Sequence, residues 1–269
     1  MAIDTDIQWC DSTANPQMGC EGCELVKGQE FPKCYAKQLT DRYKGLKGWP
    51  ESFEQPKIFP ERVKKMLQWK DLTGSIRPDK PWLNGMPRVI FLNDMGDTFS
   101  KGMPKDWLAE YLPAIAASPH IYMMLTKWPE RMAKFSQKYP LPKNIWPGTS
   151  VTGDKTKFRS YQLNNNVIAE GVKWLSIEPL WTDVTWSVPD VDNVKLFIYG
   201  GESGSRAEPF HLEWMGNQIS FCRNFGKSFF LKQLGAKPYV NGKRLILKDG
   251  HGGNMNEWPE ALQIREFPC

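Results

Sequence analysis

Arg88-Val-Ile-Phe-Leu-Asn93 is a short apolar run between turn residues, and it opens a regular alternation of strand and helix patterns. An apolar run of this length predicts a strand that is buried on both faces. The strands that we expect from such runs are Ile7–Cys10, 88–93, 121–126, 145–151, 172–177, 195–199 and 228–231. The helices that we expect are 33–44, 61–69, 106–117, 129–139, 154–164 and 212–224. An apolar spacing of four supports 33–44, and 154–164 is expected to be a polar helix.

This alternation predicts the fold class. Strands that alternate with helices form parallel β-α-β units. The first predicted strand is not followed by a Gly-x-Gly-x-x-Gly turn, which argues against a dinucleotide-binding Rossmann domain. The sequence therefore predicts an α/β fold, a full or partial (β/α) barrel of parallel strands. We expect a single domain over residues 1–269, with an irregular tail from 236 to 269, because no linker-like stretch divides the pattern.

The composition is that of a globular protein, with 41% hydrophobic and 24% charged residues. No apolar run reaches the length of about 18 residues that a membrane-spanning helix needs. The first six residues include two aspartates and lack the apolar core of a secretory signal. We therefore expect a cytoplasmic protein that does not interact with a membrane.

Three of the six cysteines lie in one loop after the first predicted strand: Cys20, Cys23 and Cys34. The Cys-x2-Cys spacing lets two sulfurs face one centre, and Gly28 and Pro32 let the chain return with the third. Thiolate ligands select zinc or iron–sulfur clusters. Because a structural zinc site usually has four ligands, three thiolates favour a [4Fe-4S] cluster with one iron open to a substrate or cofactor.

Other interpretations of these cysteines are also compatible with the sequence. Cys10 could complete a four-thiolate zinc site, or the loop cysteines could be free or disulfide-bonded at the surface. Clustered cysteines in an apparently cytosolic chain are more typical of metal ligands than of disulfides. We expect Cys222, in a predicted helix, and Cys269, the last residue, to be inert.

Polar residues follow almost every predicted strand, where the active site of a β/α barrel lies. Loop polarity alone explains hydroxyl groups better than carboxylates directly after an apolar strand. The carboxylates in this position are Asp94, Glu178 and Glu202. The pair Gly200-Gly201 would let the backbone approach a ligand closely, and Lys127 and Lys232 could bind a carboxylate or phosphate.

The net charge of +5 is unevenly distributed. Between Lys33 and Lys80 there are 12 Lys or Arg against 6 Asp or Glu, and between 225 and 248 there are six Lys or Arg and no acid. If the two segments converge, they form a phosphate-binding surface. The alternative is an ordinary solvated face.

Taken together, these motifs resemble the phage Gp37/Gp68 family, which has the organisation of radical S-adenosylmethionine (SAM) enzymes. The resemblance extends over nearly the whole chain, although the spacing Cys-x2-Cys-x10-Cys departs from the usual Cys-x3-Cys-x2-Cys of those enzymes. The blocks that carry it are Ile7-Gln-Trp9, Gly19-Cys20, Lys33-Cys34-Tyr35-Ala36, Asn93-Asp94-Met95-Gly96-Asp97, Leu125–Met132, Gly148–Val151, Leu175–Leu180, Tyr199–Gly204 and Phe230–Gly235.

The resemblance implies that Cys20, Cys23 and Cys34 hold a [4Fe-4S] cluster whose open iron binds SAM. An electron from a host reductant would cleave SAM to a 5′-deoxyadenosyl radical that abstracts a hydrogen from the substrate, while the protein orients the cofactor. The resemblance also implies the residues around SAM. By position, these are Asn93, Asp94 and Asp97 near the methionine amino group, Thr149 and Ser150 or Glu178 near the ribose, and Gly200, Gly201 and Glu202 on the adenine or substrate side.

The resemblance further implies a DNA or modified-nucleotide substrate in the host cytoplasm. Such phage proteins are implicated in thymidine hypermodification that evades restriction, including the isomerisation of a nitrogen-linked glycine to a carbon-linked amino acid. The basic segments would then bind DNA phosphates, and some of the 12 Trp would stack on a base. The alternatives are lesion repair of the spore photoproduct lyase type, peptide modification, or a zinc-bound nucleic-acid-binding protein without turnover.

Overall fold

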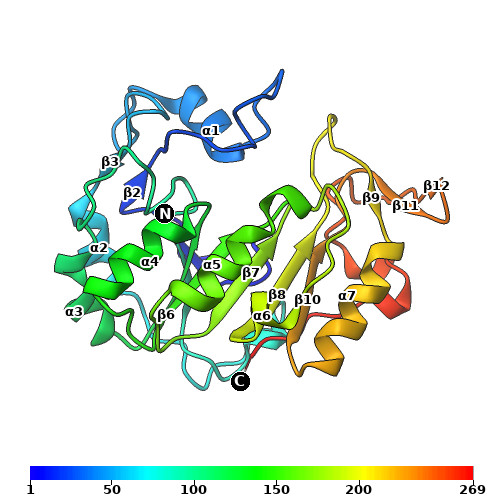
Figure 1. The fold of residues 1–269 in the computed structure, drawn as a ribbon. Helices are drawn as coiled ribbons and strands as arrows, with labels where there is room; N and C mark the ends of the chain where they lie inside the picture. Colours follow the sequence, from blue (N-terminus) through cyan, green and yellow to red (C-terminus); the bar gives the residue numbers. More distant parts are fainter. Residues whose placement is uncertain (269) are drawn as a thin grey trace. The chain divides into compact units, whose positions relative to one another are not determined.

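A computed structural model of the chain describes residues 1–268, and its main element is a parallel sheet of seven strands (Figure 1). In sheet order the strands are β1 (Ser12–Ala14), β4 (Val89–Leu92), β5 (Ile121–Thr126), β6 (Ile145–Ser150), β7 (Lys173–Ile177), β8 (Val194–Gly200) and β10 (Ser228–Gln233). In this sheet β1 and β10 are the edge strands, so the barrel is partial. The predicted α/β class, with a partial (β/α) barrel, is confirmed.

The strands form where the sequence has continuous apolar runs. All four residues of β4, four of the six in β5 and six of the seven in β8 are buried, as expected of parallel strands that are covered on both faces. Two other small sheets are present. They contain β2 (Gln17–Met18) and β3 (Lys57–Ile58), and β9 (Phe210–His211), β11 (Pro238–Val240) and β12 (Lys243–Arg244).

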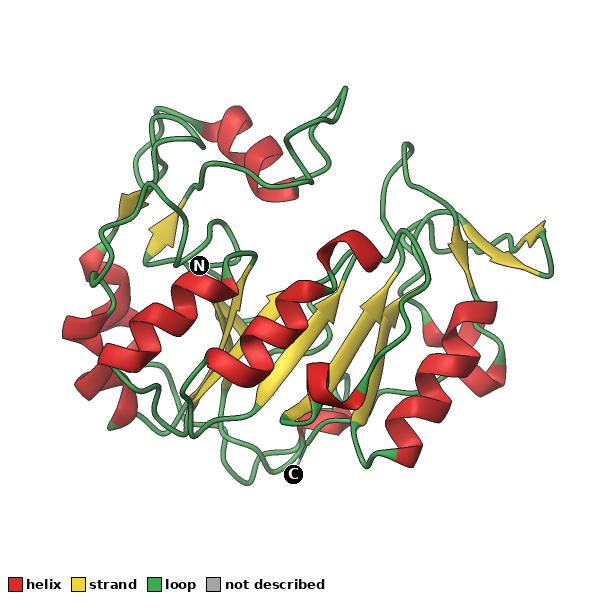
Figure 2. Ribbon diagram, in the orientation of Figure 1, coloured by secondary structure: helices red, strands yellow, loops and turns green. Residues whose placement is uncertain are grey.

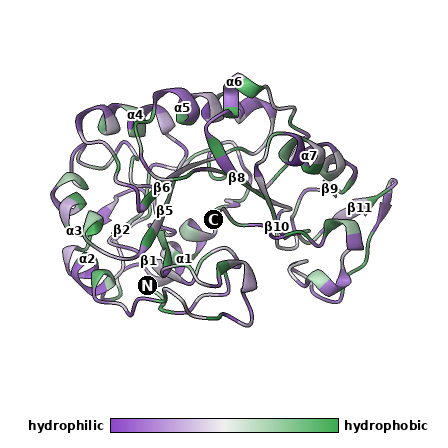
Figure 3. Cartoon of the chain, turned by 90° about the horizontal axis from the view of Figure 1, so that it is seen from below, coloured by the Kyte–Doolittle hydropathy of each residue, from purple (hydrophilic) through white to green (hydrophobic). Residues whose placement is uncertain are grey.

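Within each compact part of the chain, the helices that connect strands pack alongside those strands, whereas the helix Tyr35–Tyr43 lies beyond the strand ends (Figures 2 and 3). The helices are α1 (Tyr35–Tyr43), α2 (Pro60–Leu67), α3 (Leu112–Ala116), α4 (Pro129–Lys138), α5 (Phe158–Asn166), α6 (Val188–Val191) and α7 (Glu213–Asn224). Short 3-10 helices are η1 (Pro81–Leu83), η2 (Ala109–Tyr111), η3 (Asp154–Thr156), η4 (Met255–Glu257) and η5 (Glu260–Leu262). Both α2 and α4 begin with a proline, which suits the first turn of a helix.

Three sequence predictions about elements are wrong. The predicted helix 154–164 is divided into η3 and α5. Ile7–Cys10 is a turn, and the first strand is Ser12–Ala14, whose polar residues are nevertheless buried beside β4. The predicted helix 106–117 is divided into η2 and α3. Pro113 lies at the start of α3 and has no backbone N–H, which opposes one continuous helix through this stretch.

The chain divides into two compact units. We call residues 1–147 with 167–171 the N-terminal unit, and residues 148–166 with the chain from Val172 onward the C-terminal unit. The predicted single domain stays a prediction. The predicted irregular tail contains β11, β12, η4 and η5, and Trp258 within it is 4% exposed. Among the described residues, every helix is too short or too polar to cross a membrane.

A buried ion pair fixes the first part of the N-terminal unit. Arg77 donates from Nε to Asp11 Oδ1 at 2.7 Å and from Nη2 to Asp11 Oδ2 at 3.2 Å. The same guanidinium donates to the carbonyls of Leu83, Met86 and Pro87. Asp11 Oδ2 also accepts the backbone N–H of Val89 at 2.8 Å, which ties this network to β4.

Candidate functional site

The backbone at the start of the cysteine loop is hydrogen-bonded to other segments of the N-terminal unit. Gly19 N donates to the Met95 carbonyl at 2.9 Å, and Cys20 N donates to the Phe53 carbonyl at 2.8 Å. Gly19 has φ +85°, and a Cβ atom there would lie 2.6 Å from the Phe53 oxygen. The glycine is therefore required at this point by both its conformation and its surroundings.

The three loop cysteines are free and partly exposed. Burial raises the pKa of Cys20, with smaller contributions from Asp97, Cys34 and Cys23. Burial also raises the pKa of Cys23, and Cys34 adds to this shift. Cys34 is the N-cap residue of α1. Burial therefore disfavours the thiolate forms of Cys20 and Cys23 in the protein without a bound metal.

The loop cysteines do not form a ready-made metal site. In residues 1–268 no group of three or more His, Cys, Asp or Glu side chains is placed to hold a metal ion. The predicted cluster and the alternative zinc site both stay predictions. Cys10, which would have completed a zinc site, is fully buried, and its carbonyl accepts from Lys80 Nζ.

Asp97 is a buried acid near the cysteine loop, and its carboxylate accepts hydrogen bonds from three groups. Its Oδ1 accepts from Thr126 Oγ1 at 2.7 Å and from Phe99 N at 3.0 Å, and its Oδ2 accepts from Lys127 N at 2.9 Å. Burial raises the pKa of this carboxyl group, which is only 6% exposed. Asp97 therefore joins the ends of β4 and β5.

Lys127 carries the positive charge of this region. Desolvation opposes its charge, but Cys23, Glu24, Cys34 and Asp97 together raise the pKa of the Lys127 ammonium above its usual value. The ammonium group therefore stays charged between the cysteine loop and the end of β5. In this position it can balance negative charge on the loop sulfurs.

Asn93 and Asp94 differ in how many of their side-chain hydrogen-bonding atoms remain available to a ligand. Asn93 has φ 63° and uses both ends of its amide inside the protein, accepting from Gln17 N at 2.9 Å and donating to Thr98 Oγ1 at 2.8 Å. Asp94 Oδ1 accepts from Asn15 Nδ2 at 2.6 Å, and Tyr35 lies 3.5 Å from Oδ2. Of the two, Asp94 retains a carboxylate oxygen able to accept from a ligand.

Replacing Asp97 with alanine should lower the free energy of unfolding by about 3 kcal/mol. The substitution leaves the donors of Thr126, Lys127 and Phe99 without their acceptor in a buried place, and each such loss costs about 1–3 kcal/mol. Urea unfolding of the two proteins measures the difference. Asp79→Ala is the control, since Asp79 is exposed, and equal effects of the two substitutions would contradict the assignment.

The predicted site residues of the C-terminal unit form a separate group of contacts. Lys232 Nζ lies 3.1 Å from Glu178 Oε1, so these two predicted ligand-binding residues pair with each other. Glu202 Oε2 accepts from Trp181 Nε1 at 3.0 Å and from Glu208 N at 3.1 Å. Each charged side chain in this group has a protein partner.

The glycine pair of this unit is required by protein packing. A Cβ atom on Gly200 would lie 2.5 Å from Glu178 Oε1, and one on Gly201 would lie 2.3 Å from the Leu234 carbonyl oxygen. Gly201 N donates to the Gln233 carbonyl at 3.1 Å, so this amide is already used. The space left by the missing side chains of these two glycines is therefore filled by other protein groups. The predicted close approach of a ligand to this backbone stays a prediction.

Thr149 and Ser150 lie in β6 and are almost fully buried, opposite Leu175 and Ser176 of β7. Their predicted role near a ribose, like that of Glu178, stays a prediction. The two basic segments fall in different units, and their predicted convergence also stays a prediction.

Sequence reasoning missed two residues that position the site in the N-terminal unit. Asn15 donates to Asp94 and accepts the Met95 backbone N–H at 3.0 Å, and the Tyr35 hydroxyl donates to the Asp94 carbonyl at 2.6 Å. Tyr35 lies next to Cys34 in a block already singled out. Asn15 had no such signal, because its partners lie about 80 residues away in the chain.

Comparison with known proteins was made by family, by curated protein and by solved structure. Searches of curated proteins and of solved structures each return no match. The family described as "Protein of unknown function (DUF5131)" matches residues 4–258, which is nearly the whole sequence. The chain therefore belongs to the DUF5131 family.

Proposed function

We propose that the protein is a radical SAM enzyme in which Cys20, Cys23 and Cys34 hold a [4Fe-4S] cluster. One observation carries the proposal: three free, partly buried thiols lie in one loop of the N-terminal unit, whose backbone is bonded to the residues that follow β4. When bound, the cluster and SAM would supply a carbon-centred radical that abstracts hydrogen from a substrate. The resemblance to the phage Gp37/Gp68 family supports the same chemistry.

The residues of the N-terminal unit would bind and orient the cofactor. Lys127 balances the charge of the thiolates and makes their deprotonated form more favourable. Asp94 is the predicted acid best suited to accept from the methionine amino group, because one of its oxygens keeps acceptor capacity. Asn93 and Asp97 instead hold the backbone around it.

The substrate that we propose is DNA or a modified nucleotide, acted on in the cytoplasm with electrons from a host reductant. The basic segments 33–80 and 225–248 support a phosphate-bearing substrate. Thymidine hypermodification by isomerisation is the reaction we propose first, and repair of a DNA lesion is the alternative.

The proposal is tested by assembling the cluster without oxygen and supplying SAM with a strong reductant. We expect a brown protein with iron and labile sulfide that releases 5′-deoxyadenosine. Asp94→Asn should keep the cluster but bind SAM more weakly, because the amide removes the charge that would meet the amino group. A colourless protein with zinc and no labile sulfide would refute the proposal.

Cluster assembly should depend on pH. Burial raises the pKa of Cys20 and Cys23, so both thiols carry protons at neutral pH and must lose them when metal binds. Metal binding is therefore favoured as the pH rises, and assembly should be more complete at about pH 9 than at about pH 7. The contents of iron and labile sulfide per chain, measured across this pH range, show whether assembly rises or falls with pH. A yield that falls with rising pH would contradict protonated ligands.

A further inference from the structure

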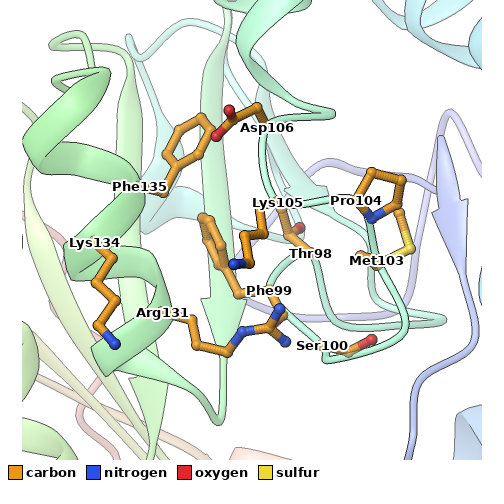
Figure 4. A pocket seen from close by; sticks show the side chains of 10 residues that line it. All are labelled: Thr98, Phe99, Ser100, Met103, Pro104, Lys105, Asp106, Arg131, Lys134 and Phe135. Atoms are coloured by element: carbon orange, nitrogen blue, oxygen red, sulfur yellow. The ribbon is translucent and has the colours of Figure 1, made fainter.

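A second feature of the N-terminal unit is a cavity of about 220 Å³ beside α4, shown in Figure 4. The loop after β4 forms one wall of the cavity, and α4 forms the other. The side chains that line it include three cations: Lys105, Arg131 and Lys134. In Figure 4, Lys105 and Arg131 extend from opposite walls toward the same space.

No carboxylate neutralises these cations. Asp106 is the one acid lining the cavity, and its Oδ2 is bound by Lys138 Nζ at 2.7 Å. Lys105, Arg131 and Lys134 make no ion pair within the part of the chain that the structure describes. Like charges that face one space repel one another, and a bound anion would remove this repulsion.

The wall that carries Ser100 is held in place. Arg131 Nη1 donates to the Phe99 carbonyl at 2.5 Å, which leaves the other guanidinium donors for a ligand. Phe99 N in turn donates to Asp97 Oδ1 at 3.0 Å. The cavity is therefore connected through two hydrogen bonds to the acid at the end of β4.

We propose that this cavity binds a phosphate group, with Lys105 and Arg131 as its ligands and Lys134 adding positive charge to its wall. Phosphate offers several strong acceptor oxygens and a negative charge, which match a cluster of cations. A cavity of about 220 Å³ exceeds the space of a few waters, so it also accommodates groups attached to the phosphate. The inference goes beyond the proposed radical chemistry and needs no cluster.

The test measures binding of three phosphate sources to the purified full-length chain: inorganic phosphate, thymidine monophosphate and a short DNA duplex. Titration calorimetry serves the first two ligands, and fluorescence anisotropy serves the duplex. Binding of the nucleotide or phosphate identifies a free ligand, and binding of the duplex alone identifies the nucleic-acid backbone. Absence of binding for all three ligands would overturn the proposal.

Variants then assign the binding to this cavity. Lys105→Gln with Lys134→Gln should weaken binding by about tenfold or more, because charge-assisted hydrogen bonds are lost. For the duplex arm, the slope of log affinity against log salt should fall by about 2. Lys143→Gln is the matched control, since Lys143 is exposed, lies in the same unit and does not line the cavity.

The double lysine variant also separates binding from folding. Lys105 and Lys134 are both exposed, so their substitution should leave the thermal midpoint unchanged. An affinity of this variant equal to that of the Lys143→Gln control would show that the phosphate binds elsewhere.

Discussion

Cys20→Ala, Cys23→Ala and Cys34→Ala are each expected to lose the iron–sulfur cluster and, with it, all release of 5′-deoxyadenosine. The three cysteines are the thiols of one loop, and a cluster that keeps one iron open has no spare protein ligand. Removing one thiolate leaves two, which is too few to hold the cluster. Iron, labile sulfide and the spin resonance spectrum of the reduced protein measure the loss directly.

Cys222→Ala is the matched control for these variants. Cys222 is a buried cysteine of α7 in the C-terminal unit, and burial raises the pKa of its thiol to about 12. Its removal changes the cysteine count equally but should leave the cluster and SAM cleavage intact. If the loop variants retained iron and sulfide as fully as Cys222→Ala does, the assignment of the ligands would be wrong.

Arg77→Ala is expected to lower the free energy of unfolding by about 3–5 kcal/mol, because it leaves a buried carboxylate without its charged partner. Both members of the pair are at most 8% exposed, so water cannot replace the guanidinium. The substitution also leaves the carbonyls of Leu83, Met86 and Pro87 without a donor. Arg77→Lys should recover only part of the loss, because an ammonium cannot bind both carboxylate oxygens and the carbonyls together.

Urea unfolding followed by circular dichroism measures this effect. Lys138→Ala is the control, because its ion pair with Asp106 has both side chains well exposed and should contribute nothing measurable. A loss of less than about 1 kcal/mol for Arg77→Ala would mean that the buried pair does not hold this part of the unit together.

The fold could be predicted largely from local patterns. The runs at 89–92 and 121–125 lack charged residues and are largely apolar because both faces of a parallel strand are covered, and this signal is readable without tertiary information. Ser12–Ala14 had no such signal. These short and partly polar residues form a strand because β4 supplies their backbone partners, a contact between segments far apart in sequence.

The sequence predicted which residues belong to the candidate site better than it predicted the contacts that these residues make. The clustering of Cys20, Cys23 and Cys34 follows from short spacings, which constrain the chain locally. The pairing of Glu178 with Lys232, and the use of both ends of the Asn93 amide by the protein, depend on tertiary contacts that no spacing reveals. The cavity beside α4 was missed because its cations come from two separated segments.

The cysteine loop has one more consequence, which concerns the lifetime of the protein in the cell. The loop is bonded to the rest of the unit near Cys20 and at Pro32, while Lys27 and Phe31 between them are exposed. Exposed positions in a loop are preferred sites for proteases. If the loop holds the proposed cluster, bound cofactor would protect these positions by mass action, and the abundance of the protein would follow the supply of iron.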